Sequence, residues 1–379
     1  MPRYDLIATS TFGLESVVAE ELKLLGYTDL TVENGKVSFT GDARAIAHCN
    51  VWLRTADRLL IRMADFVATD FGQLFDRTLE IPWEELIPEN GRMHVVGKSV
   101  RSTLFSVPDC QSIVKKAVVE AMKKKYHRGW FDESGPVYKI EVALLKDHVT
   151  LTVDTTGAGL HKRGYRKEAG EAPIKETLAA ALVLLSRWNA SRILADPFCG
   201  SGTIPVEAAL IGKNIAPGVN REFVAEAWAQ IPLRVWAEVR NEARRHVSDA
   251  PVSILASDAD GAMLNIARRN ARNAGVAECI TFRELSMEKF SSEKKFGCLV
   301  CNPPYGERTG EEKQVEGLYT SLGQLYTRLD GWSMFILSAH PYFERFFGRR
   351  ADKKRKLYNG KIQCYFYQYF GPLPSRQAR

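Results

Sequence analysis

The sequence has 379 residues, more than one ordinary hydrophobic core can serve, so we expect two or three domains. Hydrophobic residues make up 45% and charged residues 26%, which excludes a disordered or collagen-like protein. The 52 Lys and Arg residues against 45 Asp and Glu give a formal net charge of +7, a moderate bias towards polyanions such as nucleic acids.

Neither the apolar segments nor the cysteines indicate an exported or membrane protein. No apolar run approaches membrane-spanning length, and residues 1–5 lack the apolar stretch of a signal peptide, so we expect a cytoplasmic protein with no membrane partner. The seven cysteines are scattered and odd in number, which argues against a disulfide scaffold. Cys298 and Cys301 have CxxC spacing, but residues three apart on a strand point to opposite faces. We therefore predict that both are core residues. No cluster has metal-ligand spacing, so no metal is expected.

Residues 1–62 are predicted to form a small α+β unit. We expect a strand over 4–9, a helix over 15–25 that ends at Gly26, a strand pair over 32–39 that turns at Asn34-Gly35, and a helix over 43–55.

Residues 63–160 are predicted to form a second α+β unit, with helices over 71–79, 83–86 and 107–126, a strand over 92–98 and a hairpin over 138–154. Its cations gather at the end of the strand and along the long helix: Lys98, Arg101, Lys115, Lys116, Lys123, Lys124, Lys125 and Arg128. This arrangement suits the tracking of phosphates. For residues 123–125 a solvated helix face explains the charges equally well.

Residues 161–174 are predicted to link the amino-terminal units to the rest of the chain, because the stretch 154–173 holds four glycines and a proline. The linker is also basic. Lys162, Arg163 and Arg166 are candidate RNA contacts, since they would lie between two possible nucleic-acid surfaces. A plain tether is the alternative.

A glycine-rich turn opens the last domain, residues 175–379. After a helix over 175–188, a buried strand over 193–195 ends at residues 196–203, whose sequence is Asp-Pro-Phe-Cys-Gly-Ser-Gly-Thr, and a helix follows. Such a turn lets a ligand approach the backbone, and Asp196 adds a carboxylate. The turn lacks the lysine of a nucleoside-triphosphate loop and the third glycine of the dinucleotide fingerprint. It suits a cationic ligand that carries an amino acid, such as S-adenosylmethionine.

The next strand, over 253–258, ends at Asp258, a position suited to binding ribose hydroxyls. Asp260 and Gly275 are predicted to begin and end the helix that follows. A third strand over 280–285 comes before Ser286 and Met287.

The most informative segment is Asn302-Pro303-Pro304-Tyr305, which follows a buried strand over 297–301 and continues through Glu307 and Arg308. The Asn302 side-chain oxygen and the Pro303 carbonyl can both accept hydrogen bonds from one exocyclic amine, while the Tyr305 ring stacks on the base that carries it. The motif is typical of amino-methyltransferases. The alternative is a plain Pro-Pro turn.

The remaining chain is predicted to hold a fifth strand over 332–338 and a closing hairpin that turns at Asn359-Gly360. The basic run over 349–361 either protects a sheet edge or contacts RNA, and we slightly favour RNA.

Taken in order, residues 196–203, Asp258 and residues 302–308 resemble class I S-adenosylmethionine-dependent methyltransferases. Residues 98–102, the long helix, the hairpin and residues 159–166 resemble the THUMP RNA-binding module, preceded by a ferredoxin-like segment. The stretch 349–360 is similar to the tail of bacterial 23S rRNA guanine-N2-methyltransferases. This resemblance implies an α/β Rossmann-like domain with a mostly parallel seven-stranded sheet, preceded by α+β ferredoxin-like and THUMP domains.

The resemblance also implies the roles of residues. S-adenosylmethionine, which leaves as S-adenosylhomocysteine, would be bound by Asp196, Pro197, Gly200, Gly202, Thr203, Asp258, Ser286, Met287 and Asn302, and the catalytic residues would be Asn302, Pro303, Pro304 and Tyr305. Where relatives often place an acidic or amide side chain to bind adenine, this chain has Ser286 and Met287. Backbone groups would have to replace that side chain.

The implied reaction is methylation of the exocyclic N2 amine of a guanine in 23S rRNA, with RNA as the partner and no obligate protein partner. Acceptors at Asn302 and Pro303 would favour a pyramidal nitrogen aimed at the methyl group, so alignment does most of the work. Three alternatives stay open: a guanine in tRNA, an adenine amine, and an inactive RNA-binding scaffold.

Overall fold

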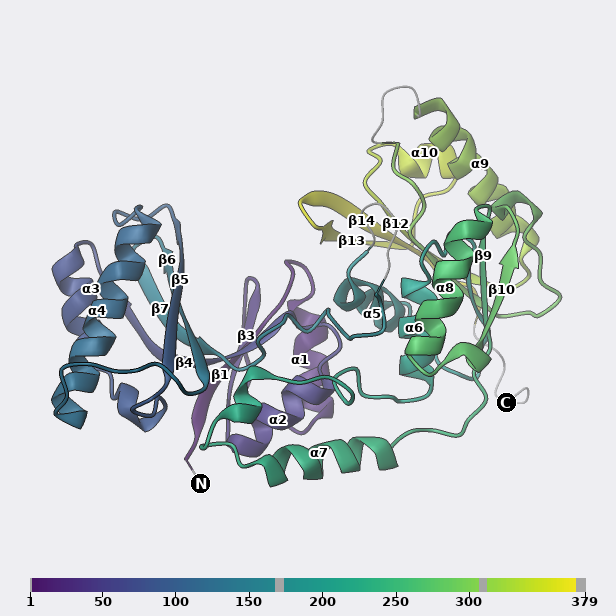
Figure 1. Ribbon diagram of the computed structural model, residues 1–379. Helices are drawn as coiled ribbons and strands as arrows, with labels where there is room; N and C mark the ends of the chain where they lie inside the picture. Colours follow the sequence, from purple (N-terminus) through teal and green to yellow (C-terminus); the bar gives the residue numbers. More distant parts are fainter. Residues whose placement is uncertain (1, 168–173, 307–311, 373–379) are drawn as a thin grey trace.

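The computed structural model describes residues 2–167, 174–306 and 312–372, and these residues form two seven-stranded sheets with helices packed on them (Figure 1). One sheet builds the amino-terminal half and the other the carboxyl-terminal half. In Figure 1 the first sheet lies on the left and the second on the right, with α1 and α2 between them.

The amino-terminal sheet has the order β2 (Thr31–Glu33), β3 (Lys36–Gly41), β1 (Tyr4–Thr9), β4 (Arg58–Val67), β7 (His148–Asp154), β6 (Val137–Leu145) and β5 (Arg92–Val100). Its helices are α1 (Glu15–Leu24), α2 (Ala43–Trp52), α3 (Phe71–Leu79) and α4 (Val107–Tyr126), with a 3-10 turn at Trp83–Glu85. The predicted helix end at Gly26 is confirmed, since Gly26 has φ +94°. The Asn34-Gly35 hairpin is also present between β2 and β3.

Strand β4 belongs to both amino-terminal units. It pairs with β1 through Leu6 and Ile61, and with β7 through Asp65 and Thr150. The sequence did not predict this strand, because an irregularity in register between Arg62 and Ala64 breaks the period of two. The expected boundary between residues 62 and 63 lies inside β4, so the two units share one continuous sheet.

The carboxyl-terminal sheet has the order β10 (Ile280–Glu284), β9 (Ile254–Asp258), β8 (Leu194–Asp196), β11 (Cys298–Cys301), β12 (Ser333–Ser338), β14 (Ile362–Tyr369) and β13 (Lys353–Asn359). The first five strands are parallel, and β14 pairs antiparallel with both of its neighbours, β12 and β13. This confirms the predicted mostly parallel Rossmann-like sheet. In chain order, β8, β9 and β10 lie side by side towards one edge of the sheet, and β11 then pairs with the opposite side of β8. The strand order therefore reverses between β8 and β11. Sheets of this kind bind ligands at such a topological switch point.

Helices cover both faces of this sheet: α5 (Glu176–Leu185), α6 (Thr203–Gly212), α8 (Gly261–Asn273), α9 (Glu312–Arg328) and α10 (Phe343–Phe347), with 3-10 turns at Ala277–Cys279 and Met287–Lys289. The 3-10 turn at Val224–Ala227 and helix α7 (Leu233–Arg245) lie between α6 and β9 in the sequence. Cys298 packs in the cluster on one face of β11 and Cys301 in the cluster on the other. The prediction that both are core residues is therefore confirmed. In the described part of the chain no helix is both long and apolar enough to cross a membrane.

The segment between α6 and β9 fastens the two halves together. Phe223, Trp228 and Trp236 belong to the amino-terminal core rather than to the core of their own sheet. Trp228 stacks on Tyr138 of β6 with ring centroids 4.7 Å apart. Helix α7, at the bottom of Figure 1, packs against α2. This segment therefore completes the amino-terminal core.

The basic run near the carboxyl terminus forms the edge strand β13, which pairs only with β14 among the described strands. Part of its outer side faces the amino-terminal half, where Arg355 donates to the Ser16 hydroxyl at 3.1 Å and Tyr358 meets Phe12 edge to face. The run therefore has a structural role at this edge. Contact with RNA stays a prediction.

Candidate active site

The glycine turn lies at the carboxyl end of β8. Asp196 is 1% exposed, and its Oδ1 accepts from the Phe198 amide at 3.0 Å. Its Oδ2 has no hydrogen-bond partner among the described residues. Burial raises the pKa of the Asp196 carboxyl well above its ordinary value, and the nearby charge of Asp258 raises the pKa further. A buried oxygen of this kind is costly unless a ligand, a cation or water bonds to it.

The two glycines of the turn serve different needs. Gly202 has φ +82°, and a Cβ there would lie 3.0 Å from the Ala267 Cβ, so Gly202 allows α6 to pack against α8. Gly200 has φ +50°, and the nearest described atom to an added Cβ would be the Met263 Cε at 4.0 Å. The backbone at Gly200 is thus open to a ligand, whereas Gly202 is needed for packing.

Asp258 ends β9 beside this turn. Its Oδ2 accepts from the Gly200 amide at 2.9 Å, and its Oδ1 accepts from the Asp260 amide at 3.0 Å. Asp260 caps α8 as predicted, because its side chain accepts from the Ala262 amide at 2.8 Å. Asp258 therefore ties the second strand end to the glycine turn while it keeps further acceptor sites on both oxygens.

The other predicted cofactor residues gather at the same edge of the sheet. Pro197 is buried in the turn, and Thr203 begins α6, where its Oγ1 accepts from Arg166 Nη1 at 3.4 Å. The loop after β10 lies against the end of β9, since the Leu285 amide donates to the Asp258 carbonyl at 2.9 Å. Ser286 is half-buried, but the Met287 side chain is 2% exposed and packs in the core. At Met287 only the backbone remains to meet an adenine.

Asn302 follows β11, the strand that pairs with β8, so it lies across the switch point from the glycine turn. Its Oδ1 accepts a hydrogen bond from the Tyr305 hydroxyl, and the half-buried Tyr305 ring packs beside the core. Pro303 is buried and Pro304 exposed. Asn302 Oδ1 keeps a second lone pair beside the bond from Tyr305, so it can accept from an incoming amine as well. The stacking of Tyr305 on a base stays a prediction, and Glu307 and Arg308 lie outside the described residues.

The predicted RNA contacts of the amino-terminal half are exposed but not all free of partners. Lys98 pairs with Glu141 at 2.7 Å, and Lys115 pairs with Glu133 at 3.1 Å. Arg101 is exposed with φ +51° at the end of β5, and Lys116 lies 5.9 Å from the centroid of the Phe75 ring. Surface ion pairs of this kind contribute little to stability. Contact of these cations with RNA phosphates stays a prediction.

The three linker cations have different surroundings. Lys162 is exposed, as an RNA contact requires. The Arg163 side chain is 2% exposed, with its Nε 3.4 Å from Glu207 Oε1 and its Nη1 donating to the Leu160 carbonyl at 2.6 Å. This burial removes Arg163 from the candidate RNA contacts.

Arg166 is also largely enclosed. It donates to Glu176 at 3.0 Å and to the Ile174 carbonyl at 2.8 Å, besides its contact with Thr203. The linker is thus bound to α5 and α6 through Arg163 and Arg166, and residues 168–173 lie outside the described residues.

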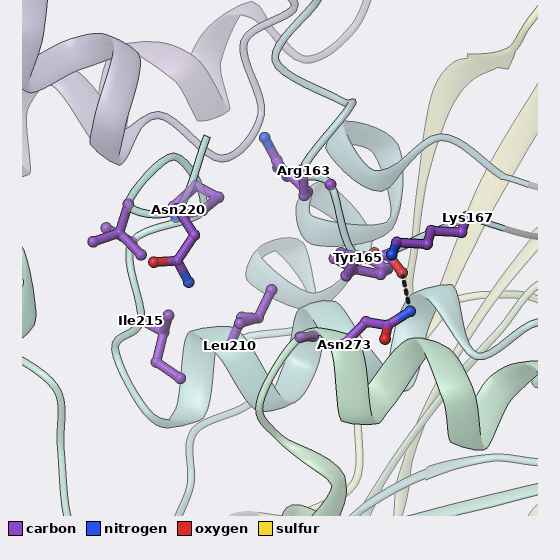
Figure 2. Close-up of a pocket in the computed structure, with 12 residues that line it drawn as sticks. Arg163, Tyr165, Lys167, Leu210, Ile215, Asn220 and Asn273 are labelled. Carbon is purple, nitrogen blue, oxygen red and sulfur yellow. Dashed lines mark hydrogen bonds between the residues drawn. The ribbon is translucent and has the colours of Figure 1, made fainter. Parts of the chain in front are cut away.

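A cavity of about 300 Å³ lies beside the linker, away from the glycine turn (Figure 2). Arg163, Tyr165 and Lys167 line one side, and Leu210, Ile215, Asn220 and Asn273 line the others. The Asn273 side chain donates to the Tyr165 carbonyl at 3.0 Å and so fixes the linker on the end of α8. None of the predicted cofactor residues lines this cavity.

Three domain families match the chain. Residues 5–60 match the RlmL ferredoxin-like domain, residues 68–154 the THUMP domain, and residues 163–368 the RMKL-like methyltransferase domain. The chain is 51% identical, over 100% of its length and 99% of the relative, to the putative RNA methyltransferase YpsC of Bacillus subtilis. It is 34% identical over 96% of its length to the ribosomal RNA large subunit methyltransferase K/L of Legionella pneumophila, of which it spans 52%.

Two solved structures are similar to this chain over nearly its whole length. A predicted N6-adenine-specific DNA methylase from Listeria monocytogenes is 52% identical with a TM-score of 0.94, covering 98% of this chain and 97% of that one. The putative methyltransferase SMU.472, complexed with S-adenosylhomocysteine, is 43% identical with a TM-score of 0.95, covering 99% and 100%. The chain spans about half the length of the K/L relatives but nearly all of these structures.

Proposed function

This chain belongs to the RMKL-like methyltransferase family, and we propose that it transfers a methyl group from S-adenosylmethionine to the exocyclic N2 amine of a guanine in 23S rRNA. The observation that carries the proposal is the position of Asn302-Pro303-Pro304-Tyr305 at the end of β11, across the switch point from the glycine turn at the end of β8. An acceptor for an amine and a turn for the cofactor therefore stand at one edge of the sheet.

The residues of the turn fit S-adenosylmethionine. The backbone at Gly200 leaves room for close approach, and Asp196 holds a buried oxygen without a partner among the described residues. A cationic ligand beside Asp196 would lower the raised pKa of its carboxyl, so the charge of the ligand would offset the cost of burial. Asp258 would accept from the ribose hydroxyls. When bound, the cofactor supplies an electrophilic methyl group on a sulfonium.

The contribution of the protein to the reaction would be to align the amine of the guanine with the methyl group. A guanine turned out of its stack would give its amine hydrogens to Asn302 Oδ1 and to the Pro303 carbonyl, which directs the nitrogen lone pair away from the ring plane. Two fixed acceptors do this without a general base, because the nitrogen attacks as a neutral amine. Once methylated it is a strongly acidic cation, which would release its proton to water after the neutral thioether has left. Asn302 Oδ1 has a second lone pair, so the Tyr305 hydroxyl could keep its bond to Asn302 and hold the acceptor in place while the amine binds.

The amino-terminal half would supply placement on RNA. Lys98, Arg101, Lys115, Lys116 and Lys162 would contact backbone phosphates, which fix position and carry little sequence information. We place Arg166 with the cofactor turn rather than with RNA, because its guanidinium reaches Thr203 and Glu176. Specificity would then come from RNA shape and from the flipped base.

The test is methyl transfer from labelled cofactor to separated 23S rRNA, 16S rRNA and tRNA from cells that lack the protein, followed by nucleoside analysis. We expect label in N2-methylguanosine of 23S rRNA. Label in tRNA or in N6-methyladenosine would move the proposal to another substrate. This outcome matters because the motif suits either amine and the similar Listeria protein is described as a predicted N6-adenine-specific DNA methylase. Cofactor binding with no transfer to any pool would favour the scaffold alternative.

A further inference from the structure

A chain of hydrogen bonds runs from the Pro304 carbonyl into the sheet. The Tyr319 hydroxyl on α9 lies 2.9 Å from the Pro304 carbonyl oxygen and 3.0 Å from the Ser338 Oγ at the end of β12. The His340 amide donates to the same Ser338 oxygen at 3.1 Å. The side chains of Tyr319 and Ser338 are both 0% exposed. The loop after β11 is thus tied to the neighbouring strand of the same sheet.

The donor and the acceptor of each hydrogen bond in this network follow from the backbone groups at its two ends. A backbone amide only donates, so Ser338 Oγ accepts from His340, and a carbonyl only accepts, so Tyr319 donates to Pro304. Each hydroxyl has one hydrogen, and Ser338 must therefore donate to Tyr319. Burial raises the pKa of Tyr319 to about 12, which keeps its hydroxyl protonated as a donor at neutral pH.

The loop after β11 depends on a hydrogen bond of this kind because it contains two consecutive prolines. Pro303 and Pro304 have no amide hydrogen, so this part of the loop can be held only through its carbonyls and side chains. The Tyr319 ring is itself fixed, since it meets Phe343 and His340 edge to face with centroids 4.9 and 5.4 Å away. Its hydroxyl therefore offers a rigid donor to a loop that lacks donors.

We propose that Tyr319 is a positioning residue for methyl transfer, which holds the Pro304 carbonyl so that Asn302 and the Pro303 carbonyl present their acceptors at a fixed spacing. This inference rests on the proposed function. Two acceptors must meet the hydrogens of one nitrogen, so a small rotation of the Pro303–Pro304 peptide misdirects one of them. Misplacement by about 1 Å costs on the order of a hundredfold in rate.

Tyr319→Phe tests the role with the smallest possible change, because it removes one oxygen and keeps the ring. We expect kcat for RNA methylation to fall about ten- to a hundredfold, while the KM for RNA and the dissociation constant of S-adenosylhomocysteine change less than about threefold. Tyr326→Phe is the matched control on the same helix. Its hydroxyl accepts from Arg349 at 3.4 Å, away from Pro304, and kcat should stay unchanged.

Ser338→Ala separates positioning from general loss of stability. Tyr319 can still donate to Pro304 in this variant, so its kcat should fall less than that of Tyr319→Phe, and the double variant should be no slower than Tyr319→Phe alone. Losses that instead follow the melting temperatures of the three variants would overturn the proposal.

Amide hydrogen exchange of the peptide over 300–306 gives a readout that needs no RNA. Exchange should quicken in Tyr319→Phe and not in Tyr326→Phe. A wild-type protein that methylates no RNA would overturn the proposed function on its own. An active wild type with a Tyr319→Phe variant of unchanged kcat and unchanged exchange would overturn only the role of Tyr319.

Discussion

Asp258→Ala should weaken cofactor binding through two effects that the structure separates. Each carboxylate oxygen of Asp258 already accepts one backbone amide, from Gly200 and from Asp260, and each has a further lone pair for a ribose hydroxyl. The variant therefore loses the ribose contacts and also leaves the glycine turn untied. The bond to Gly200 matters most, because Gly200 is where the backbone is open to the ligand.

The expected size follows from hydrogen bonds to a charged group, which contribute about 1.5 to 3 kcal/mol. This corresponds to a rise in the dissociation constant of S-adenosylhomocysteine of roughly 10- to 150-fold. Calorimetric titration of the wild type and the variant measures it directly.

Asp260→Asn is the matched control. It removes the same unit of charge two residues away, and asparagine caps a helix about as well as aspartate, so α8 should keep its start. Affinity in this control should change less than about threefold. An unchanged affinity in Asp258→Ala would remove Asp258 from the site, and equal losses in both variants would show that charge alone, rather than the contacts of Asp258, is responsible.

Three further predictions concern RNA, the linker and pH. In the full chain, replacing Lys98 and Arg101 by Ala should lower the slope of log affinity for 23S rRNA against log salt by up to about two, and an unchanged slope would remove both from the interface. Arg163→Met leaves Glu207 buried without its cation, so the free energy of unfolding in urea should fall by about 3 to 5 kcal/mol with the salt slope unaltered; a stable variant with a lower slope would return Arg163 to the RNA contacts. Burial raises the pKa of Asp196, so the stability it contributes is complete below the ordinary aspartate pKa of about 4 and is lost as the pH rises through the raised value. Stability of the cofactor-free protein between pH 4 and 8 should therefore decline less in Asp196→Asn, and parallel curves would contradict this.

The RNA test uses the full chain because the amino-terminal half is not complete without a later segment. Phe223, Trp228 and Trp236 fill its core, and a fragment that ends before them would expose that core to water. Sequence periodicity indicates that these aromatic residues are buried. It does not tell which of two cores they enter, since this depends on how the chain returns across the molecule.

Local sequence patterns were sufficient to predict the parts of the site where glycines, prolines and strand ends determine the path of the backbone. The glycine turn, the cap at Asp260 and the end of β11 at Asn302 follow from the sequence, and the strand order brings them to one edge. The Tyr319 network was missed because it joins groups from separate elements. The Tyr305 to Asn302 bond lies within one loop and was missed because it depends on the path of that loop, which the motif alone does not determine.

The burial of Arg163 shows what charge alone fails to predict. A run of cations in a linker has the same composition whether it faces solvent or a buried carboxylate. The useful signal was in another element: Glu207 is the one acidic residue in the otherwise apolar helix α6, and it is 0% exposed. A buried carboxylate requires a partner, and the basic linker supplies one in Arg163.

The most direct test of the central claim compares wild type and Asn302→Ala for transfer of labelled methyl to 23S rRNA, with S-adenosylhomocysteine affinity measured on both proteins. Wild type should form N2-methylguanosine, and Asn302→Ala should lose on the order of a hundredfold or more in kcat at nearly unchanged cofactor affinity, because the amide acts on the base. Normal turnover by Asn302→Ala would contradict the account, since residues 302–305 would then be only a turn at the end of β11.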